Sequence, residues 1–504
     1  MKKYGLLFIT CLFLIFNSFT FSNTSVRKWE IFEISLNGPS TGNPFKDVTI
    51  SAEFMNGNIK RIIEGFYDGN GIYKIRFMPD SLGSWRYRTI SNVKSFADKK
   101  GKFECIPPSP ENHGVVRIKN TFNFAYSDGK QFYPFGTTCY AWIHQTDSLQ
   151  ELTVKTLSKS PFNKVRMCIF PKRYVWNENE PLYYPYEGTP PNNWDFSRFN
   201  PQFFENLEKR IKQLEDLGIE CDLILFHPYD GGHWGFDRMT TEQNDFYLRY
   251  IIARLSAFRN VWWSLANEYD FISSKKEEDW DRFFKILQTE DPYNHLRSIH
   301  HSRIWYDLTK PWVTHASIQD DPWNIREWRE KYKKPIIVDE CKYEGNIKYS
   351  WGDLTAQDMT MRFWVAITSG GYASHGETYM DSNDVLWWSK GGVLKGESPA
   401  RIGFLQKIVE SAPPGDFEPF VGTTEIWNRK YAVKVRDEYL LFYFGDRQPI
   451  EREIVLPSEA KYSIDIIDTW NMTITKLDGY YNGKTLIHLP GKPYIALRAI
   501  KIKK

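Results

Sequence analysis

The chain has little cysteine and no long apolar run beyond its N-terminus, and each shortage excludes a class of protein. Six cysteines stand among 504 residues, and no two of them have a CxxC spacing. Without an N-terminal signal five remain, an odd number at wide intervals, which supports neither a disulfide framework nor a zinc site. We therefore expect buried free thiols. No later stretch has the length of a membrane span.

Neither sign of charge dominates the chain. It carries 65 basic and 62 acidic residues, a net charge of +3. This balance gives no electrostatic basis for binding nucleic acid or an anionic membrane surface. Aromatic residues are abundant instead, at 16%, with 19 Trp and 29 Tyr. Such rings fill the cores of large sandwiches and barrels, and they also line grooves in which sugar rings stack.

The first 22 residues have the pattern of an export signal. Lys2 and Lys3 precede an almost wholly apolar run over residues 4–16, and small or polar residues lead to a cut near Asn23. The run is short for a membrane span, although retention as an uncleaved anchor remains an alternative. We expect an exported protein, periplasmic or extracellular.

The pattern of the remaining chain changes twice, which predicts three domains. Residues 26–107 show short alternating strands separated by Gly, Asn and Asp, typical of an N-terminal Ig-like β-sandwich. A Pro-rich linker at residues 107–112 follows. Residues 115–413 alternate short apolar strands with amphipathic helices, and residues 416–504 return to strands, which predicts a C-terminal β-sandwich.

The central segment predicts an α/β fold, a (β/α)8 TIM barrel, because eight strands in about 300 residues match the usual size of that fold. The expected strands are residues 133–140, 164–170, 220–226, 261–266, 297–301, 313–318, 335–339 and 372–375. The clearest helices are residues 203–217, 242–258, 277–287 and 355–368.

Catalytic residues of such barrels lie at the C-terminal ends of the strands. The polar residues found there include a majority of the chain's ten histidines. The full set is His144, Arg166, His227, Asp230, Asn267, Glu268, His300, His301, His315, Asp339, Glu340, His375 and Glu377.

Two of these residues, Glu268 and Glu340, form the carboxylate pair that glycosidic cleavage needs. One carboxyl group must protonate the leaving oxygen, and the other must attack the anomeric carbon or activate water. Glu268 ends the fourth strand and Glu340 the seventh. Alternation along the seventh strand places Glu340 on the inner face with Ile336 and Val338 and Asp339 on the other face, although a shift of one residue would favour Asp339.

A metal site is the competing interpretation of the same rim, since His and Asp are also metal ligands. Against it, the first strand ends without a His-x-His pair, and His300 and His301 are adjacent, so a strand would send them to opposite faces. We expect no metal and no cofactor.

The pattern of Asn267-Glu268 at the end of the fourth strand and Glu340 at the end of the seventh resembles clan A of the retaining glycoside hydrolases. That resemblance implies that Glu268 is the acid/base and Glu340 the nucleophile. Two details depart from it. The sixth strand usually offers Tyr, and here His315 is nearest. The usual Trp after the eighth strand has Tyr379 and Trp387 as candidates.

A closer resemblance, to the apiosidase-like bacterial hydrolases, covers nearly the whole chain. It rests on the runs at residues 136–142, 226–230, 262–270, 338–341 and 374–379. It implies a barrel between two sandwiches, and it does not fix the substrate. The residues it implies around the sugar are His144, Arg166, His227, Asn267, His315, His375 and Glu377. Trp142, Asp230 and His301 complete the set of ten residues that we expect to bind substrate.

The sequence therefore predicts a glycoside hydrolase that cleaves O-glycosidic bonds of a complex, plant-type polysaccharide or oligosaccharide by a retaining mechanism. The alternative from another class is a non-catalytic carbohydrate-binding protein on a barrel scaffold. The partner is a carbohydrate in both cases, with no nucleic acid. The oligomeric state, the linkage and the choice between chain-end and internal cleavage stay open.

Overall fold

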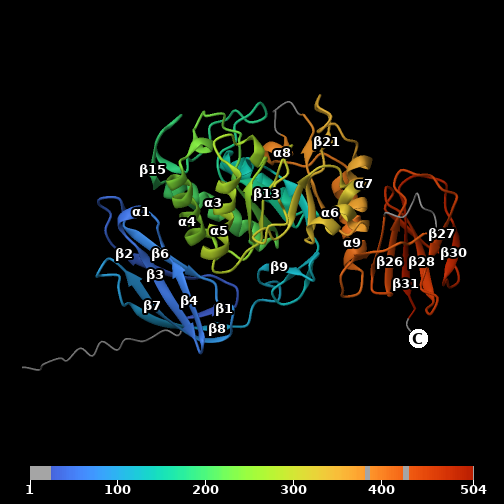
Figure 1. Cartoon of the computed structure of the whole chain (residues 1–504), viewed down its shortest axis with the longest axis horizontal. Helices are drawn as coiled ribbons and strands as arrows, with labels where there is room; N and C mark the ends of the chain where they lie inside the picture. The colour runs from blue at the N-terminus through green and yellow to red at the C-terminus, as the bar shows by residue number, and fades with distance from the viewer. Residues whose placement is uncertain (1–23, 381–385, 424–430, 503–504) are drawn as a thin grey trace, which may run out of the picture.

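The computed structural model describes residues 24–380, 386–423 and 431–502 and arranges them as a β-sandwich, a barrel and a second set of β-sheets (Figure 1). The predicted signal, residues 1–22, lies outside the described residues. Within the described ranges, no helix has the length and apolar character needed to cross a membrane.

The N-terminal part consists of two sheets packed face to face. One has the strand order β1-β8-β7-β3-β4 and the other β2-β6-β5. Aromatic rings join them: Phe54 of one sheet stacks on Phe77 of the other at 4.2 Å, and Phe32 stacks on Phe103 at 4.1 Å. The elements are β1 (Ser25–Arg27), β2 (Phe32–Asn37), α1 (Pro44–Asp47), β3 (Ile50–Asn56), β4 (Ile59–Glu64), β5 (Phe66–Tyr67), β6 (Ile72–Phe77), β7 (Gly83–Ser91) and β8 (Lys100–Ile106).

Eight parallel strands form the central barrel, in the order β18-β17-β16-β13-β12-β22-β20-β19. The two end strands are joined by one backbone hydrogen bond, from Thr314 N to Arg297 O at 2.9 Å, so the barrel is nearly closed. The strands are β12 (Phe135–Thr138), β13 (Lys164–Cys168), β16 (Glu220–Phe226), β17 (Val261–Ala266), β18 (Arg297–Ser298), β19 (Ala316–Gln319), β20 (Ile336–Glu340) and β22 (Tyr372–His375).

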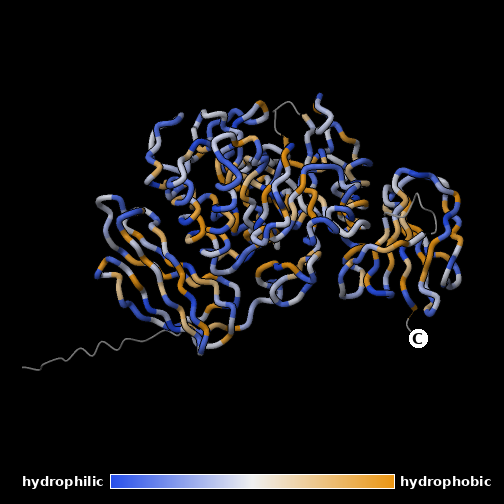
Figure 2. The backbone as a smooth tube through the Cα atoms, viewed as in Figure 1, coloured by the Kyte–Doolittle hydropathy of each residue, from blue (hydrophilic) through white to orange (hydrophobic). Residues whose placement is uncertain are grey.

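All eight predicted strands overlap with these, three of them with identical bounds. Their residues are almost all buried, as expected for parallel strands covered on both faces, and Figure 2 shows hydrophobic segments running through the centre of the barrel. The helices around them are α2 (Asp147–Leu157), α3 (Pro201–Asp216), α4 (Thr241–Leu255), α5 (Glu277–Glu290), α6 (Ile325–Tyr332), α7 (Ala356–Thr368), α8 (Trp387–Lys390) and α9 (Ser398–Glu410).

The helices begin where their sequences predict. Asn200 accepts a hydrogen bond from the backbone N–H of Gln202, and Pro201 occupies the first turn of α3. Thr240 and Gln243 form a reciprocal capping box at the start of α4. Both helices thereby begin directly after loops at the catalytic end of the barrel.

The opposite end of the barrel is covered by a small sheet of β9 (Val116–Lys119), β10 (Asn123–Tyr126) and β11 (Gln131–Phe132). Phe124 of β10 contacts the rings of Trp262, His315 and Tyr372 at centroid distances of 5.3, 5.8 and 5.5 Å. This end is filled with side chains, so it offers no entry to the barrel centre.

The C-terminal part has a six-stranded sheet, β24-β25-β26-β31-β28-β29, and a pair, β27-β30. Its buried core includes Phe442, Ile454 and Leu497, which come from both sheets. The elements are β24 (Glu418–Pro419), β25 (Ala432–Val435), β26 (Tyr439–Tyr443), β27 (Glu451–Val455), β28 (Tyr462–Asp468), β29 (Thr473–Lys476), β30 (Lys484–His488) and β31 (Ile495–Lys501).

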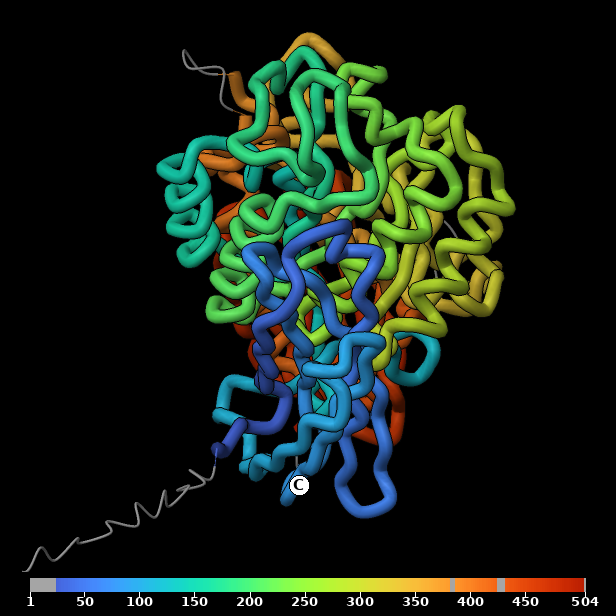
Figure 3. The backbone as a smooth tube through the Cα atoms, turned by 90° about the vertical axis from the view of Figure 1, so that its left-hand side faces the viewer, coloured from blue at the N-terminus to red at the C-terminus, as the bar shows by residue number. Residues whose placement is uncertain are grey.

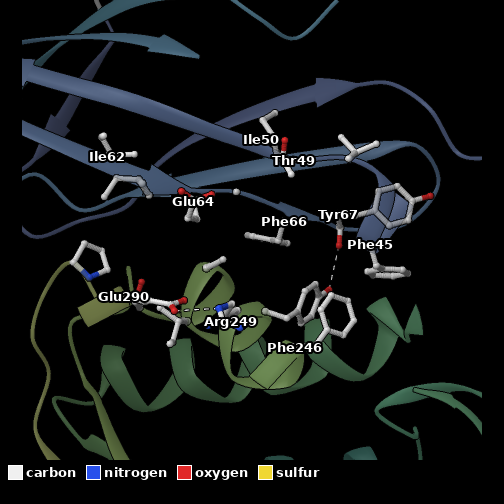
Figure 4. Close-up of a pocket in the computed structure, with 18 of the residues that line it drawn as sticks. Phe45, Thr49, Ile50, Ile62, Glu64, Phe66, Tyr67, Phe246, Arg249 and Glu290 are labelled. Carbon is white, nitrogen blue, oxygen red and sulfur yellow. Dashed lines mark hydrogen bonds and ion pairs between the residues drawn. The ribbon is translucent and has the colours of Figure 1, made fainter. Parts of the chain in front are cut away.

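Buried ion pairs join the N-terminal sandwich to the barrel, against which it lies in Figure 3. Arg76 of β6 contacts Glu208 of α3 at 2.6 Å, and Arg254 of α4 contacts Asp68 at 2.7 Å. Beside these pairs a cleft of about 600 Å³ separates β4 and β5 from α4 (Figure 4). Its wall is mainly apolar, with the Arg249–Glu290 ion pair at one side.

Candidate active site

A cleft of about 660 Å³ opens at the C-terminal ends of the barrel strands and contains both predicted catalytic glutamates. Asn267, Glu268, Gln319 and Glu340 line it together. Its walls are unusually aromatic, which suits the apolar faces of sugar rings. The aromatic residues are Tyr140, Tyr174, Trp176, Tyr229, Phe271, Tyr343, Tyr349, Trp351 and Trp388.

Glu268 lies two residues beyond the end of β17 and has a left-handed backbone, with φ of +47°. A non-glycine residue in this region costs about 1–3 kcal/mol, and such strain is concentrated at functional sites. The carboxylate accepts hydrogen bonds from the hydroxyl of Tyr229 and from Nε2 of Gln319, the latter at 3.1 Å. The strained backbone thus directs the Glu268 side chain into the cleft.

Glu340 is the last residue of β20, and a β-bulge precedes it. The register pairs Ile318 with Val338 and then Gln319 with Glu340, which leaves Asp339 unpaired. Because a bulge interrupts alternation, both Asp339 and Glu340 reach the barrel interior. The expectation that Asp339 faces away from the interior is therefore wrong.

One amide group joins the two carboxylates. Gln319 Nε2 donates to Glu268 at 3.1 Å and to Glu340 at 3.0 Å. Since both oxygens are about 3 Å from the same nitrogen, they lie no more than about 6 Å apart. Retaining glycosidases hold their carboxyl groups about 5–5.5 Å apart and inverting enzymes about 6.5–9.5 Å. The two oxygens bonded to Gln319 therefore lie closer together than the range given for inverting enzymes.

Burial controls the protonation of the pair. It raises the pKa of Glu340 to about 8, an effect that the neighbouring Tyr343 reduces. It also raises the pKa of Glu268 above the ordinary carboxyl value, while the ammonium group of Lys172 acts in the opposite direction. Two interacting carboxyl groups titrate as a pair, so these shifts belong to the pair and not to one residue alone.

Donors and a cation surround the carboxyl group of Glu340. The Tyr140 hydroxyl donates to Glu340, and Arg166 Nη1 lies 3.7 Å from the same carboxylate. Arg166 also donates to Asn267 Oδ1 at 2.9 Å. Opposite charge and hydrogen bonds both favour a carboxylate anion.

Beneath the cleft, a buried ion cluster fixes the strands that carry these residues. Lys164 Nζ lies 2.6 Å from Asp222 and 2.8 Å from Asp339. Asp339 also accepts hydrogen bonds from Ser317 and Ser374, at 2.6 and 2.9 Å. The cluster connects β13, β16, β19, β20 and β22, so the two strands that end at Gln319 and Glu340 are held in position from below.

Of the ten residues predicted to bind substrate, Asn267 lines the cleft, and the other nine do not. Among those nine, Arg166 acts on Glu340 and Asn267 from beneath, as described above. The remaining eight, Trp142, His144, His227, Asp230, His301, His315, His375 and Glu377, are buried elsewhere around the rim and the base of the barrel.

Three of the histidines are buried hydrogen-bonding residues outside the cleft. His144 contacts the carbonyl of Cys168 at 3.2 Å and His227 that of Phe170 at 3.1 Å, while His375 contacts Thr137 Oγ1 at 3.1 Å. Burial lowers the pKa values of His144 and His375 to about 3 and that of His227 to about 4. These rings are neutral, so they offer the cleft no cation.

His301 and His315 are also displaced from the cleft, for two different reasons. His301 packs on Trp305 at a centroid distance of 4.0 Å, while its neighbour His300 points inward, with Nε2 3.9 Å from Glu340. His315 precedes β19 and therefore lies at its N-terminal end, against the small sheet. The residue that β19 presents to the cleft is Gln319.

Trp142, Asp230 and Glu377 stabilise the loops around the rim. Trp142 Nε1 donates to the sulfur of Met167 at 3.1 Å. Asp230 accepts from the backbone N–H groups of Gly232 and Phe236, at 2.6 and 2.7 Å. Glu377 accepts from those of residues 395 and 396, at 2.6 and 2.8 Å. These hydrogen bonds occupy the polar atoms of Trp142, Asp230 and Glu377 that would otherwise be available to a sugar.

Sequence reasoning missed most of the aromatic wall. The tryptophan that follows the eighth strand and lines the cleft is Trp388; Trp387 instead donates to Thr137 at 2.9 Å, and Tyr379 donates to Glu344 at 3.1 Å. Tyr140 and Tyr229 each stood inside a motif that carried the family resemblance. The order of residues in those motifs could have identified both.

Among the residues that the structure describes, no group of His, Cys, Asp and Glu could hold a metal ion. The five described cysteines are free and buried. Two carboxyl groups line the cleft, with hydrogen-bond donors and aromatic rings around them.

Three family models match successive parts of the chain. The model for the apiosidase-like catalytic domain matches residues 119–415. A domain of unknown function, DUF5060, matches residues 25–92, and a second, DUF5605, matches residues 427–500. No curated protein sequence matches the chain.

Solved structures also resemble this chain. A protein from Bacteroides vulgatus ATCC 8482, described as a candidate glycoside hydrolase, is 40% identical with a TM-score of 0.90, over 95% of this chain and 100% of that one. A glycoside hydrolase family 5 structure from the same organism is 15% identical with a TM-score of 0.60, over 78% of this chain and 94% of that one, and shows the fold alone. The resemblance found in the sequence is confirmed: the chain belongs to the apiosidase-like family of glycoside hydrolases.

Proposed function

We propose that this protein is a retaining glycoside hydrolase in which Glu268 is the acid/base and Glu340 the nucleophile. The observation that carries the proposal is the Gln319 amide group, which hydrogen-bonds both carboxylates at about 3 Å. A separation of about 6 Å or less leaves too little room for a water molecule between an inverting base and the sugar. It suits direct attack by a carboxylate.

In the first step, Glu268 donates its proton to the glycosidic oxygen while the Glu340 carboxylate attacks the anomeric carbon. The bond to the leaving sugar breaks, and an ester bond between Glu340 and the remaining sugar forms. Arg166, Tyr140 and Gln319 stabilise the Glu340 carboxylate before the attack and again when it leaves.

In the second step, the ionised Glu268 removes a proton from water, and the water oxygen attacks the same anomeric carbon. The ester bond to Glu340 breaks, and the sugar is released with its original anomeric configuration. The raised pKa of Glu268 supports both roles, since a group that changes protonation twice works best with a pKa near the working pH.

We further propose that the substrate is a complex, plant-type polysaccharide or oligosaccharide and that the protein is exported. The aromatic wall supports a glycan of several sugars, because its rings extend from the glutamates to partly exposed residues such as Phe271 and Tyr349 at the mouth. The basic and apolar composition of residues 1–22 supports export.

The proposal is tested by measuring reducing sugar released from a panel of plant and microbial glycans by wild type, Glu340→Gln and Glu268→Gln. We expect turnover of at least one glycan by wild type and its loss in Glu340→Gln. The matched control is Glu344→Gln, which changes a buried glutamate that does not line the cleft. Turnover that persists in Glu340→Gln would overturn the assignment of the nucleophile.

A further inference from the structure

Lys172 is a buried cation in the cleft to which the proposed mechanism gives no role. It follows β13 in the loop at residues 171–200 and lines the cleft, with 2% of its surface exposed. Its Nζ lies 3.6 Å from the ring centroid of Tyr140, 4.1 Å from that of Tyr229 and 4.6 Å from that of Tyr174. The ammonium group is therefore enclosed by the faces of three aromatic rings.

The rings place this ammonium group beside the reacting atoms. The Tyr140 hydroxyl bonds Glu340, and the Tyr229 hydroxyl bonds Glu268. Lys172 thus lies between the two tyrosines that contact the catalytic pair. A ligand group that reaches its Nζ must belong to a sugar next to the bond that is cleaved.

The ammonium group lacks a protein partner for its charge. Among the residues that the structure describes, none is within ion-pair or hydrogen-bond distance of Lys172 Nζ, and Glu268 acts on it only from further away. When Glu268 is protonated as the acid, even that charge is lost. Contacts with rings offset part of the cost of a buried cation, but they leave its three N–H donors unused.

A buried charge without a partner is costly for folding, whereas a neutral amide or hydroxyl group would bind sugar hydroxyl groups at lower cost. Arg303 and Lys342 add further cations to the same cleft, and Asp320 and Asp321 line it as acidic groups, of which Asp321 pairs with Lys342. Burial also lowers the pKa of Lys172 to about 8, and an anion nearby would raise it again and keep the ammonium group charged at slightly alkaline pH.

We infer that Lys172 binds an anionic substituent, a carboxylate or a sulfate ester, on a sugar that flanks the scissile bond. The inference rests on the proposed function and narrows its substrate to acidic glycans. The anion accepts the N–H groups of Lys172 at the bottom of the aromatic enclosure. A charge-assisted contact of this kind, made without competing water, gives strong discrimination against the neutral sugar.

The test compares acidic glycans with their matched neutral forms. Uronate-containing glycans are compared with their carboxyl-reduced forms, and sulfated glycans with their desulfated forms. Wild type, Lys172→Met and Lys172→Arg are assayed for kcat/KM. We expect wild type to prefer one acidic form by about 30-fold or more, Lys172→Met to lose that preference, and Lys172→Arg to retain part of it. The pair that shows the preference identifies carboxylate or sulfate.

Lys342→Met is the matched control, because Lys342 lines the same cleft but already pairs with Asp321 at 3.5 Å. It should keep the acidic preference. Lys172→Met should also be at least as stable to heat as wild type, because it removes an unpaired buried charge. Equal rates on acidic and neutral forms, or marked destabilisation by Lys172→Met, would overturn the inference in favour of a structural cation.

Binding separates this inference from the proposed function. Glu340→Gln, with and without Lys172→Met, is titrated calorimetrically with the same glycan pairs. Binding of the acidic form that depends on Lys172, without turnover by wild type, supports the inference and removes the hydrolase proposal. Turnover of neutral glycans, with no acidic preference in either assay, supports the hydrolase proposal and overturns the inference about Lys172. Absence of Lys172-dependent binding to every acidic form overturns the inference.

Discussion

Replacing Lys164 by Met tests whether the buried ion cluster holds the barrel and its site together. Lys164 and its partners Asp222 and Asp339 are at most 1% exposed, and both ion pairs are shorter than 3 Å. Removing one partner of a buried pair costs about 3–5 kcal/mol, because the other charges remain without compensation. Arg166 stays 3.6 Å from Asp222 and 4.0 Å from Asp339, so we expect a loss of about 3 kcal/mol.

The assay is thermal and urea unfolding of the full chain, followed by the near-ultraviolet signal of the barrel tryptophans. A loss of this size lowers the melting temperature of a barrel of about 300 residues by roughly 5 °C. The control is Lys209→Met, which removes an ion pair with Glu151 from a side chain that is 48% exposed and should cost less than about 1 kcal/mol. Equal losses in the two variants would refute the reasoning.

The pH dependence of this effect has a definite sign. Burial raises the pKa of Asp339, but Lys164 and Arg166 reverse this and hold it below the ordinary value. The stability from this pair is thus present above the pKa of an unfolded Asp and lost as pH falls below it. In Lys164→Met the Asp339 pKa rises, so the deficit relative to wild type should be larger at pH 7 than at pH 4. A deficit that is independent of pH would contradict the assignment.

Three further predictions concern catalysis. Gln319→Leu removes a donor from both carboxylates and should lower kcat/KM by about 10- to 100-fold, with little loss of stability; an unchanged rate would contradict the bridging role. Glu268→Gln should slow cleavage of natural glycans by about 10²- to 10⁴-fold but affect aryl glycosides with good leaving groups much less; equal losses would argue against an acid role. The pH–rate profile should be bell-shaped, with its maximum between the ordinary carboxyl pKa of 4.5 and about 8, because burial raises both pKa values and the active pair holds one proton; a maximum at pH 4 or below would contradict this.

The barrel was predictable because its strands are buried on both faces. Runs such as residues 220–226 and 261–266 are continuous and apolar, end abruptly at polar residues, and are followed by amphipathic helices with strong caps. Each local signal agrees with the parallel sheet. The fifth strand shows the limit: residues 297–301 were expected, and the pairing ends at Ser298.

The site was less predictable, because two local features override simple alternation. The bulge at Asp339 changes which residues of β19 and β20 face the cleft. His315 was selected and Gln319 missed because the sixth strand was expected at residues 313–318 but lies at Ala316–Gln319. The prediction that polar residues at the rim bind the sugar was also misleading. Several rim histidines and acids satisfy loop backbone groups, and only the closed structure reveals whether a polar atom is already used.

The most direct test of the central claim is the anomeric configuration of the first product, followed by proton NMR during hydrolysis of a glycan that the wild-type protein cleaves. A pair of carboxylates joined by the Gln319 amide, no more than about 6 Å apart, predicts that the product first appears with the configuration of the substrate. First appearance of the opposite anomer would contradict the account, because Glu340 would then have to activate water instead of forming a bond to the sugar.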